Sequence, residues 1–339
     1  MDEYPEFTRN IRHSNAELEQ FLQSPIVDQR QFRCAQIELA LAERNVRELH
    51  AVVGRGGLLP PLASGTYLVN EAMLDALRLA RRGEHASNLG AFIAHDIAQK
   101  AGVQAYVVDP VSVDEWTECA RLSGSALLER QCLSHALNSK AVAKRYAREL
   151  GKAYESLRLL VAHLGSGISV SAHRNSCMID VTNSREEGAF STERAGSVPA
   201  MQLVDLCFGG KYTRKQVEEL LFREGGLYSY LSTKDLTEVE RRIASGDPKA
   251  GIVYEAMLYQ IAKEIGAMAT VLNGRVDALL LTGGMAHSQR LVSSLIERVG
   301  WIAPVVVYPG EDELQALTEG VLRVLRHEEP LQVFGSAGA

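Results

Sequence analysis

Five short stretches of this sequence carry residues that bind anions or transfer protons. Their central residues are Arg55, Asp109, His163, Arg194 and Gly283, and four of the five stretches end an apolar run. Arginine offers a planar fork of N–H donors that matches carboxylate and phosphate groups. Glycine lets backbone N–H groups crowd around an anion. These residue types therefore point to a ligand that carries carboxylate or phosphate groups.

The stretch LVAHLGSGISVSAHR, residues 160–174, poses a question of its own. Glycine weakens the interior of a strand, yet an apolar strand here ends in His163, Gly165 and Gly167, and a second strand follows at once. Either the glycines gather N–H groups around an anion with the histidine beside it, or the stretch is an ordinary hairpin turn. The residues alone leave both explanations open.

The other four stretches also have plainer explanations. Arg55 in VVGRGG ends a strand between glycines, as a surface arginine in a glycine turn would. Asp109 in VVDP follows a buried strand, where a carboxylate is costly unless it binds something, and helix capping is the competing use. Arg194 is either a ligand contact or a solvated loop arginine. Gly283 and Gly284 lie between a predicted strand and a predicted helix, as the glycines of nucleotide-binding turns do. Paired glycines at such a place are also common in proteins that bind no nucleotide.

The histidines divide into structural and functional candidates. His85 and His135 open helices, where the helix N-terminus favours an anionic ligand, although a lone histidine there is often a structural hydrogen-bonding residue. His95 lies in the middle of a predicted helix and is expected to be structural. The sequence contains no HxxxH or HxH pair, which argues against a histidine-rich catalytic metal site.

Composition excludes several classes of protein. The chain has 339 residues, 46% hydrophobic and 23% charged, with a net charge of −6, so no basic excess suits nucleic acid or an anionic membrane surface. The five cysteines are scattered and show no CxxC spacing, which predicts neither a disulfide framework nor a zinc site. No run of about 18 apolar residues suggests a membrane span. We therefore expect a cytoplasmic protein with a small-molecule ligand.

Strands and helices alternate along the chain, which predicts an α/β fold with a largely parallel sheet. A capping box of Ser14 and Glu17 marks the first helix. The predicted helices span residues 16–22, 30–45, 70–82, 87–102, 134–151, 213–226, 236–246, 251–274, 288–300 and 312–327. The predicted strands span residues 49–54, 104–110, 157–165, 167–173, 177–183, 276–284 and 303–310, and Arg174 and Asn175 are expected to form the tight turn after the fourth.

The two halves of the chain resemble each other in order. Each contains a buried strand that ends in glycines, then helices, then a strand whose end carries a turn or an acidic residue. Such a pair predicts two domains, 1–154 and 155–339, with the final helix packing back on the first. A ligand is expected in the cleft between them, at the carboxyl ends of the strands.

Taken together, these stretches resemble the butyrate kinase and branched-chain fatty-acid kinase group of the acetokinase family. The resemblance runs from residue 11 to 323, through VVGRGGLL, GEHASNLGA, VVDPVSVDE, SHALNSKAVAKRYA, VAHLGSGISVSAHR, FSTERAGSVP, LTGGMAHS and IAPVVVYPGEDELQAL. It implies two actin-like, ribonuclease H-like domains with a cleft between them. It also implies reversible phosphoryl transfer from ATP to a short-chain carboxylic acid with Mg²⁺, giving ADP and an acyl phosphate.

The resemblance also implies roles for individual residues. Arg55 and Arg194 would bracket the carboxylate and the transferred phosphoryl group, with His85 as a further substrate contact. His135 and His163 would donate to the phosphoryl oxygens. The nucleotide phosphates would lie beside Gly165, Ser166 and Gly167, and the adenosine beside Gly283 and Gly284. Asp109 would help hold the magnesium-linked assembly; Glu313 matches the acidic metal-associated residue, with Glu311 and Asp312 as rivals.

One motif of the family is expected but not found. Such kinases usually open with a strand and hairpin that read like NPGSTSTK, and Met1 begins just beyond that point. A start codon placed too far downstream, a trimmed chain, or a true loss of the element would each explain this. Two hypotheses follow: a carboxylate kinase with butyrate-like substrates, or a non-catalytic or severely impaired relative. The resemblance also implies a homodimer or higher homo-oligomer.

Overall fold

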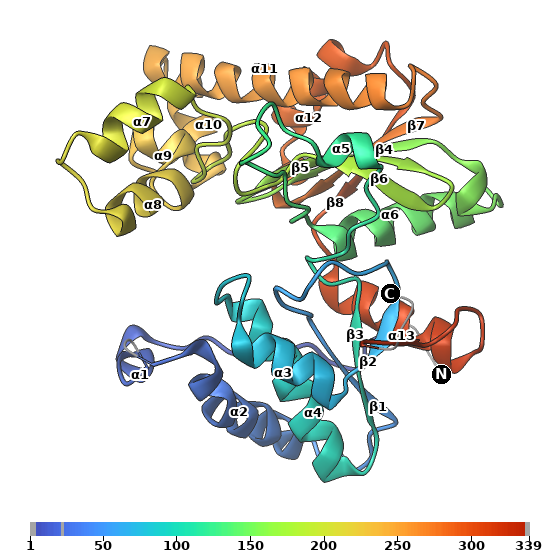
Figure 1. The fold of residues 1–339 in the computed structure, drawn as a ribbon. Coiled ribbons are helices and arrows are strands. Elements are labelled where there is room, and N and C mark those ends of the chain that lie inside the picture. The colour runs from blue at the N-terminus through green and yellow to red at the C-terminus, as the bar shows by residue number, and fades with distance from the viewer. Residues whose placement is uncertain (1–4, 22–23, 336–339) are drawn as a thin grey trace. The chain divides into compact units, whose positions relative to one another are not determined.

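The chain folds into two compact units, seen in a computed structural model that describes residues 5–21 and 24–335 (Figure 1). Unit 1 comprises Met1–Asp114 with Asp312–Ala339, and unit 2 comprises Glu115–Glu311. Residues 115–154 were assigned to the first domain from the sequence. The structure places them in unit 2, because helix α6 (Ala136–Glu149) packs against strands of that unit's sheet.

Unit 1 contains a mixed four-stranded sheet in the order β1-β3-β2-β9. Strands β1 (Ala51–Gly54) and β3 (Gln104–Val108) are parallel, while β2 (Thr66–Leu68) runs antiparallel to β3 and parallel to β9 (Gln332–Val333). Neither β2 nor β9 was expected, since β2 lies in a loop rich in proline and glycine and β9 lies in the C-terminal tail. Because β1 and β3 are parallel neighbours, the residues after Gly54 and Val108 meet at one edge of the sheet.

The helices of unit 1 begin with the predicted capping box. The Ser14 side chain accepts the N–H of Glu17, and the Glu17 side chain accepts the N–H of Ser14, which starts α1; the predicted end of this helix, Leu22, lies outside the described residues. Helix α13 packs against β1 and β3. The helix bounds are Asn15–Glu19 (α1), Arg30–Glu43 (α2), Glu71–Leu79 (α3), Leu89–Ala101 (α4) and Glu313–Leu325 (α13), with 3-10 turns at Ile26–Gln29 and Ala86–Asn88.

Unit 2 contains a five-stranded sheet in the order β6-β5-β4-β7-β8. Strands β4, β7 and β8 are parallel to one another, and β5 is antiparallel to both β4 and β6. Strands β4, β5 and β6 form an antiparallel meander, and β7 and β8 extend the sheet on the other side of β4. This is the strand order of a ribonuclease H-like sheet. The strand bounds are Leu159–Leu164 (β4), Ile168–Arg174 (β5), Cys177–Val181 (β6), Ala278–Gly283 (β7) and Val305–Pro309 (β8).

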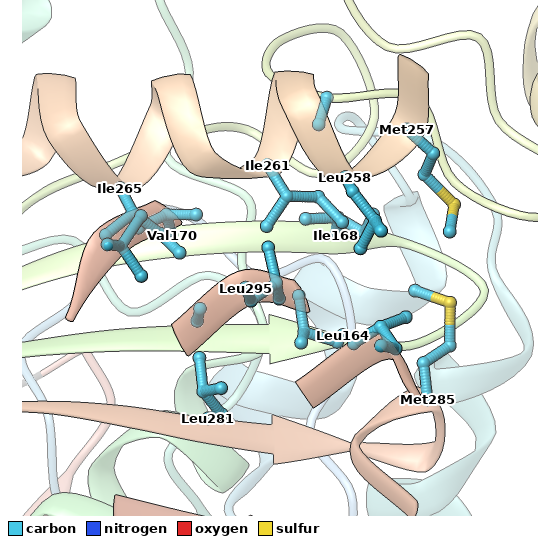
Figure 2. Close-up of a cluster of buried hydrophobic side chains, with 14 of the residues drawn as sticks. Leu164, Ile168, Val170, Met257, Leu258, Ile261, Ile265, Leu281, Met285 and Leu295 are labelled. Carbon is cyan, nitrogen blue, oxygen red and sulfur yellow. The ribbon is translucent and has the colours of Figure 1, made fainter. Parts of the chain in front are cut away.

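Helices cover both faces of this sheet, α11 (Pro248–Val271) on one face and α6 on the other (Figure 1). Side chains alternate between the faces of a strand, so Leu164, Ile168 and Val170 join the core beneath α11, as Figure 2 shows. That core consists of buried hydrophobic side chains on one side of the sheet. The remaining helices are Glu118–Arg121 (α5), Ala200–Phe208 (α7), Arg214–Phe222 (α8), Gly226–Leu231 (α9), Leu236–Ala244 (α10) and Gln289–Val299 (α12).

The same alternation gives the α6 face of the sheet a polar row. His163 is the register partner of Ser169, and the next positions of that face on β5 are Ser171 and His173. All four residues are buried. Because β5 turns its aliphatic residues toward α11, its serines and histidine face α6, and this row is the scaffold on which the candidate site stands.

The turn between β5 and β6 differs from the expectation by one residue. Arg174 pairs with Cys177, so the two turn residues are Asn175 and Ser176, not Arg174 and Asn175. Both have a positive φ, of 52° and 58°, which is the conformation of a type I′ hairpin turn. Asparagine tolerates that conformation better than arginine does, and the turn forms accordingly.

The structure bears on two further expectations from composition. The cysteines, all five within the described ranges, are free thiols. Over the part of the chain that the structure describes, none of the helices has both the length and the apolar character that crossing a membrane requires. The expected cytoplasmic location and the expected cleft between domains stay predictions.

Candidate active site

The candidate residues of unit 2 gather where three parallel strands end. His163 near the end of β4 is the register partner of Thr282 on β7, and Thr282 is the partner of Tyr308 on β8. The carboxyl ends of parallel strands are where α/β proteins bind ligands. The segments that follow these strands, residues 165–167, 283–284 and 310–311, therefore lie along one edge of the sheet.

His163 is buried, with 1% of its surface exposed, and both of its ring nitrogens face polar groups. Nδ1 lies 2.8 Å from Oδ1 of Asn138. Nε2 lies 3.5 Å from Oε1 of Glu311, an ion pair when the ring is protonated. A protonated ring held in this way can donate one N–H to a ligand at the strand ends while the other stays bonded to Asn138.

A second histidine stacks on the first. The rings of His135 and His163 are nearly parallel, with centroids 3.8 Å apart and an angle of 10° between their planes. His135 comes from the start of α6, and its Nδ1 lies 2.9 Å from Oγ of Ser169, the strand partner of His163. The structure therefore brings together the two histidines that the sequence placed 28 residues apart.

The glycine segment after β4 is a hairpin turn, closed by a bond of 3.2 Å from the N–H of Gly165 to the carbonyl of Gly167. That N–H is thus used within the turn. A Cβ at Gly165 would lie 3.0 Å from Nε2 of His163, so glycine leaves room beside this nitrogen. Ser166 is exposed, and its carbonyl accepts the hydroxyl of Ser191. The stretch forms a hairpin turn, and a role of this turn in holding phosphate stays a prediction.

Arg194 lies against the same turn. A Cβ at Gly167 would come within 2.5 Å of its NH1, and NH1 donates to the carbonyl of Ser184 at 3.0 Å. Burial lowers the pKa of the Arg194 guanidinium, because a desolvated cation is less stable than a hydrated one. The arginine is thus part of a fixed, partly buried structure and not a freely solvated loop residue.

The paired glycines after β7 differ from each other. Gly283 has a φ of 90°, and a Cβ there would lie 2.5 Å from the carbonyl oxygen of Leu164. Glycine at this position is required by the close approach of β4. Gly284 is exposed, and a Cβ added to it would meet no atom within 4 Å. The open space at Gly284 is consistent with the expected nucleotide contact, which the structure does not test.

In unit 1, the residues after β1 and β3 form a second cluster. NH2 of Arg55 lies 3.1 Å from Oε1 of Glu313, the first residue of α13. The carboxylate of Asp109 is buried and accepts the hydroxyl of Ser64 at 2.6 Å and the N–H of Gly65 at 2.8 Å. These bonds compensate the cost of burying the carboxylate. Arg55, Asp109 and Glu313 thus belong to the same end of the unit 1 sheet.

His85 has a local structural role. It precedes the 3-10 turn Ala86–Asn88 and accepts the N–H of Ser87 at Nδ1, at 3.2 Å. The residue is exposed. Asn88, in the same turn, accepts the N–H of Leu58 in the segment after Arg55. The turn therefore supports the loop that carries Arg55, and a direct contact of His85 with substrate stays a prediction.

Two carboxylates of unit 1 are the expected donors to a metal ion. Within the described residues, no group of three or more His, Cys, Asp or Glu side chains could hold a metal ion alone. Mg²⁺ commonly binds one or two carboxylates and completes its shell with water and phosphate oxygens. Asp109 and Glu313 offer such hard oxygen donors, so the residues fit Mg²⁺ that arrives together with a phosphate ligand.

Two residues of the site were missed by the sequence analysis. Asn138 holds His163 and also donates to the carbonyl of Glu311 at 3.0 Å. Ser169 binds His135. The signal for Asn138 was its position three residues after His135, which puts both on one face of a helix. Glu311 was considered only as a rival metal ligand, whereas its carboxylate faces His163.

The chain is similar to proteins of known family. The model of the acetokinase family matches residues 126–302 of the chain. Butyrate kinase 1 of Clostridium acetobutylicum is 51% identical over 336 residues, which cover 98% of this chain and 94% of that protein. The similarity therefore includes both clusters of candidate residues.

Solved structures show the fold. Acetate kinase of Porphyromonas gingivalis matches with a TM-score of 0.75 at 19% identity, over 85% of this chain and 84% of that one. Acetate kinase of Entamoeba histolytica matches with a TM-score of 0.72 at 16% identity, over the same shares. The predicted fold class, α/β with the domains of acetate kinases, is confirmed.

Proposed function

The chain belongs to the acetokinase family, and from that premise we propose that it phosphorylates butyrate or a similar short-chain carboxylic acid with ATP, reversibly. The predicted resemblance is confirmed, and the chain is a phosphotransferase of the carboxylate kinase type. The observation that supports the substrate class is the 51% identity to butyrate kinase 1 along nearly the whole chain.

The reaction needs no protein nucleophile and no general base. A carboxylic acid is ionised at neutral pH, and its oxygen attacks the γ-phosphorus of ATP directly. The bond from that phosphorus to the β–γ bridging oxygen breaks, ADP leaves with the electron pair, and an acyl phosphate forms without a proton transfer. The protein therefore positions the two anions and neutralises the charge on the transferred group.

The groups of unit 2 suit that task. His163, when protonated, offers Nε2–H at the end of β4, His135 stacks on it, and Arg194 adds a permanent cation beside Gly167. We assign these three residues to the oxygens of the transferred phosphoryl group. The turn 165–167 and the glycines 283–284 are assigned to the nucleotide. Fixed donors aimed at developing charge are commonly the largest contribution to catalysis.

The groups of unit 1 suit the carboxylate and the metal. Arg55 is assigned to the carboxylate, with Glu313 fixing its guanidinium at 3.1 Å. Asp109 and Glu313 would hold Mg²⁺, which when bound with the phosphates offsets their negative charge. Ser64 and Gly65 orient the Asp109 carboxylate by donating to one of its oxygens.

A coupled assay of ADP release tests the proposal. Butyrate, isobutyrate and acetate are supplied with ATP and Mg²⁺, and we expect turnover with butyrate or isobutyrate above that with acetate. His163→Ala should lower turnover by about a hundredfold or more, the usual loss when one such donor is removed. His50→Ala is the matched control, because the His50 side chain is 73% exposed. No turnover with any acid, together with retained ATP binding, would favour the alternative of an impaired or non-catalytic chain.

We also propose that the chain forms a homo-oligomer through helix α7. Met201, Val204 and Phe208 on this helix are 71%, 44% and 86% exposed, and none of its residues is buried. An apolar helix is normally held by burial of its apolar face, and large exposed apolar patches mark interaction sites. Asp205 is the one charged residue of α7, so the rest of the helix is uncharged, and a second copy of α7 would bury apolar side chains on both sides of the contact.

Light scattering after size-exclusion chromatography tests the oligomer. We expect a mass of at least twice the 37.1 kDa of the chain. Phe208→Glu should lower that mass, because it places a charge in the proposed contact. Leu79→Glu, at a residue 64% exposed in unit 1, should leave it unchanged. A monomeric unsubstituted chain would contradict the proposal.

A further inference from the structure

Asn138 connects the two parts of the candidate site in unit 2. It lies in the first turn of α6, is buried with 4% of its surface exposed, and uses both ends of its side-chain amide. Oδ1 lies 2.8 Å from Nδ1 of His163, and Nδ2 donates to the carbonyl of Glu311 at 3.0 Å. We propose that Asn138 is a positioning residue: it fixes the proton on Nδ1 of His163 and the orientation of the ring, so that Nε2 is the nitrogen that faces a phosphate-bearing ligand and donates to it when the ring is protonated.

The orientation of the amide follows from its two partners. A carbonyl oxygen can only accept a hydrogen bond, so the group of Asn138 that faces the carbonyl of Glu311 must be the NH₂. The oxygen of Asn138 therefore faces His163, where it can only accept. It follows that Nδ1 of His163 carries a proton, in the neutral ring as well as in the charged one.

The same bond fixes the plane of the ring. A hydrogen bond to a ring nitrogen lies near the ring plane, so Asn138 limits the rotation of the imidazole of His163 about its χ2 angle. His135, one turn earlier on the same helix, lies flat on that ring at a centroid distance of 3.8 Å. Asn138 thus supports the stack of the two histidines as well as the proton position.

The other end of the ring faces the glycine turn and Glu311. Glycine at position 165 leaves room at Nε2, where a Cβ would approach within 3.0 Å. Glu311 follows β8, and its carboxylate faces Nε2 at 3.5 Å. By holding the carbonyl of Glu311, Asn138 also fixes the segment that carries this carboxylate. The buried amide of Asn138 therefore determines both the protonation of Nε2 in the neutral ring and the position of the Glu311 carboxylate beside it.

NMR of the full-length chain with ¹⁵N-labelled histidine rings tests the proton position. At about pH 9, where an ordinary imidazole is neutral, the ring nitrogen shifts report which nitrogen is protonated. The variant His163→Gln assigns the resonances of His163. We expect a proton on Nδ1 of His163 in the unsubstituted chain, and its transfer to Nε2 in a large part of the molecules of Asn138→Leu.

Two more variants separate the two bonds and control for burial. Asn138→Asp keeps an oxygen for Nδ1 but loses the donor to Glu311, so the Nδ1 proton should remain. Asn183→Ala removes another buried amide of unit 2, bonded to Gln131 and to Arg185, and should leave the His163 signals unchanged. A native His163 protonated on Nε2 alone, or an Asn138→Leu chain with native signals, would overturn the proposal.

The kinetic consequence rests on the proposed function and has its own readout. Loss of a group that orients a functional histidine commonly costs about tenfold to a hundredfold in activity. Asn138→Leu should therefore lower kcat by that factor with little change in the KM for ATP, since the fault lies in orientation and not in ground-state binding. A chain without kinase activity would refute the proposed function but leave the NMR result to decide the role of Asn138.

Discussion

His173 is the most deeply buried ionisable residue of the polar row on β5, with no exposed surface. The Tyr154 hydroxyl lies 2.5 Å from its Nδ1, and Oγ of Ser171 lies 2.7 Å from its Nε2. Burial, with the nearby charge of Lys140, lowers its pKa to about 3. The native chain therefore holds this histidine as a neutral hydrogen-bonding group, whereas the unfolded chain protonates it near the ordinary value of about 6.5.

We predict a pH dependence of stability from His173. Between the two pKa values the unfolded state binds one proton more than the native state, so the free energy of unfolding rises with pH. The free energy of unfolding should fall by up to about 1.4 kcal/mol per pH unit as the pH falls from about 6.5 toward 3. When the free energy of unfolding is measured with urea from pH 4 to 7, its slope against pH should be smaller in His173→Gln by the equivalent of one proton. Equal slopes in the two chains would count against this account.

Gly167 gives a second prediction at the scale of the residue. A Cβ at this position would come within 2.5 Å of the Arg194 guanidinium, and a flexible side chain yields more easily than backbone does. Gly167→Ala should therefore change the melting temperature little but lower kcat about tenfold or more, because it displaces a cation from the proposed phosphoryl site. Gly124→Ala, where a Cβ meets nothing within 4 Å, is the control, and an equal effect of both variants would contradict the assignment.

Single residues were predicted from the sequence better than their partners were. His163 and its glycines stood out because polar and flexible residues interrupt an apolar strand. Asn138 did not, because its role depends on which face of β4 turns toward α6, and that is set by the register of five strands. The sequence also could not distinguish a hairpin from an anion site at residues 165–167, because a turn between two paired strands requires the same glycines.

At the scale of the element, the close packing of helix α13 on the sheet of unit 1 depends on a glycine. A Cβ at Gly320 would lie 2.4 Å and 2.8 Å from the two methyl groups of Val108 on β3. Valine is stiff at χ1, so one of its methyl groups cannot turn away without the other approaching. The carbonyl of Gly320 also accepts the hydroxyl of Thr66 at 3.0 Å. Glycine therefore lets the helix rest directly on the sheet of unit 1.

We predict that Gly320→Ala destabilises unit 1 by about 1–3 kcal/mol through overpacking, despite the higher helix propensity of alanine. Gly266→Ala in α11 has open space around the new methyl group and should stabilise the chain by up to about 1 kcal/mol. Chemical denaturation of both variants measures the difference. Stabilisation by both substitutions would mean that α13 does not pack on β3 as described.

The elements themselves were largely predictable. Every predicted helix and strand has a counterpart in the structure, because the apolar periods and caps are local signals. The missed strands, β2 and β9, are fixed by distant partners: β2 has three residues and exists through its pairing with β3 and β9. The missed helices α5, α7 and α9 are short, and none of the residues of α7 is buried.

At the scale of the molecule, the alternation of strands and helices predicted two α/β domains. It did not predict that residues 115–154 pack with the second sheet, since a helix between two sheets carries no local signal of which one it covers. Packing decides this, as α6 lies on β4 and β7. The α6 helix brings His135 and Asn138 to His163, so its packing on the sheet of unit 2 also positions the residues of the site.

The most direct test of the account is the detection of its product. The chain is incubated with ATP, Mg²⁺ and butyrate in the presence of hydroxylamine, which traps an acyl phosphate as a hydroxamate, and ADP is measured in parallel. We predict hydroxamate and ADP in equal amounts, both strongly reduced in His163→Ala and unchanged in His50→Ala. ADP without hydroxamate, or hydroxamate formation that is indifferent to the loss of His163, would contradict the claim that this site transfers a phosphoryl group to a carboxylate.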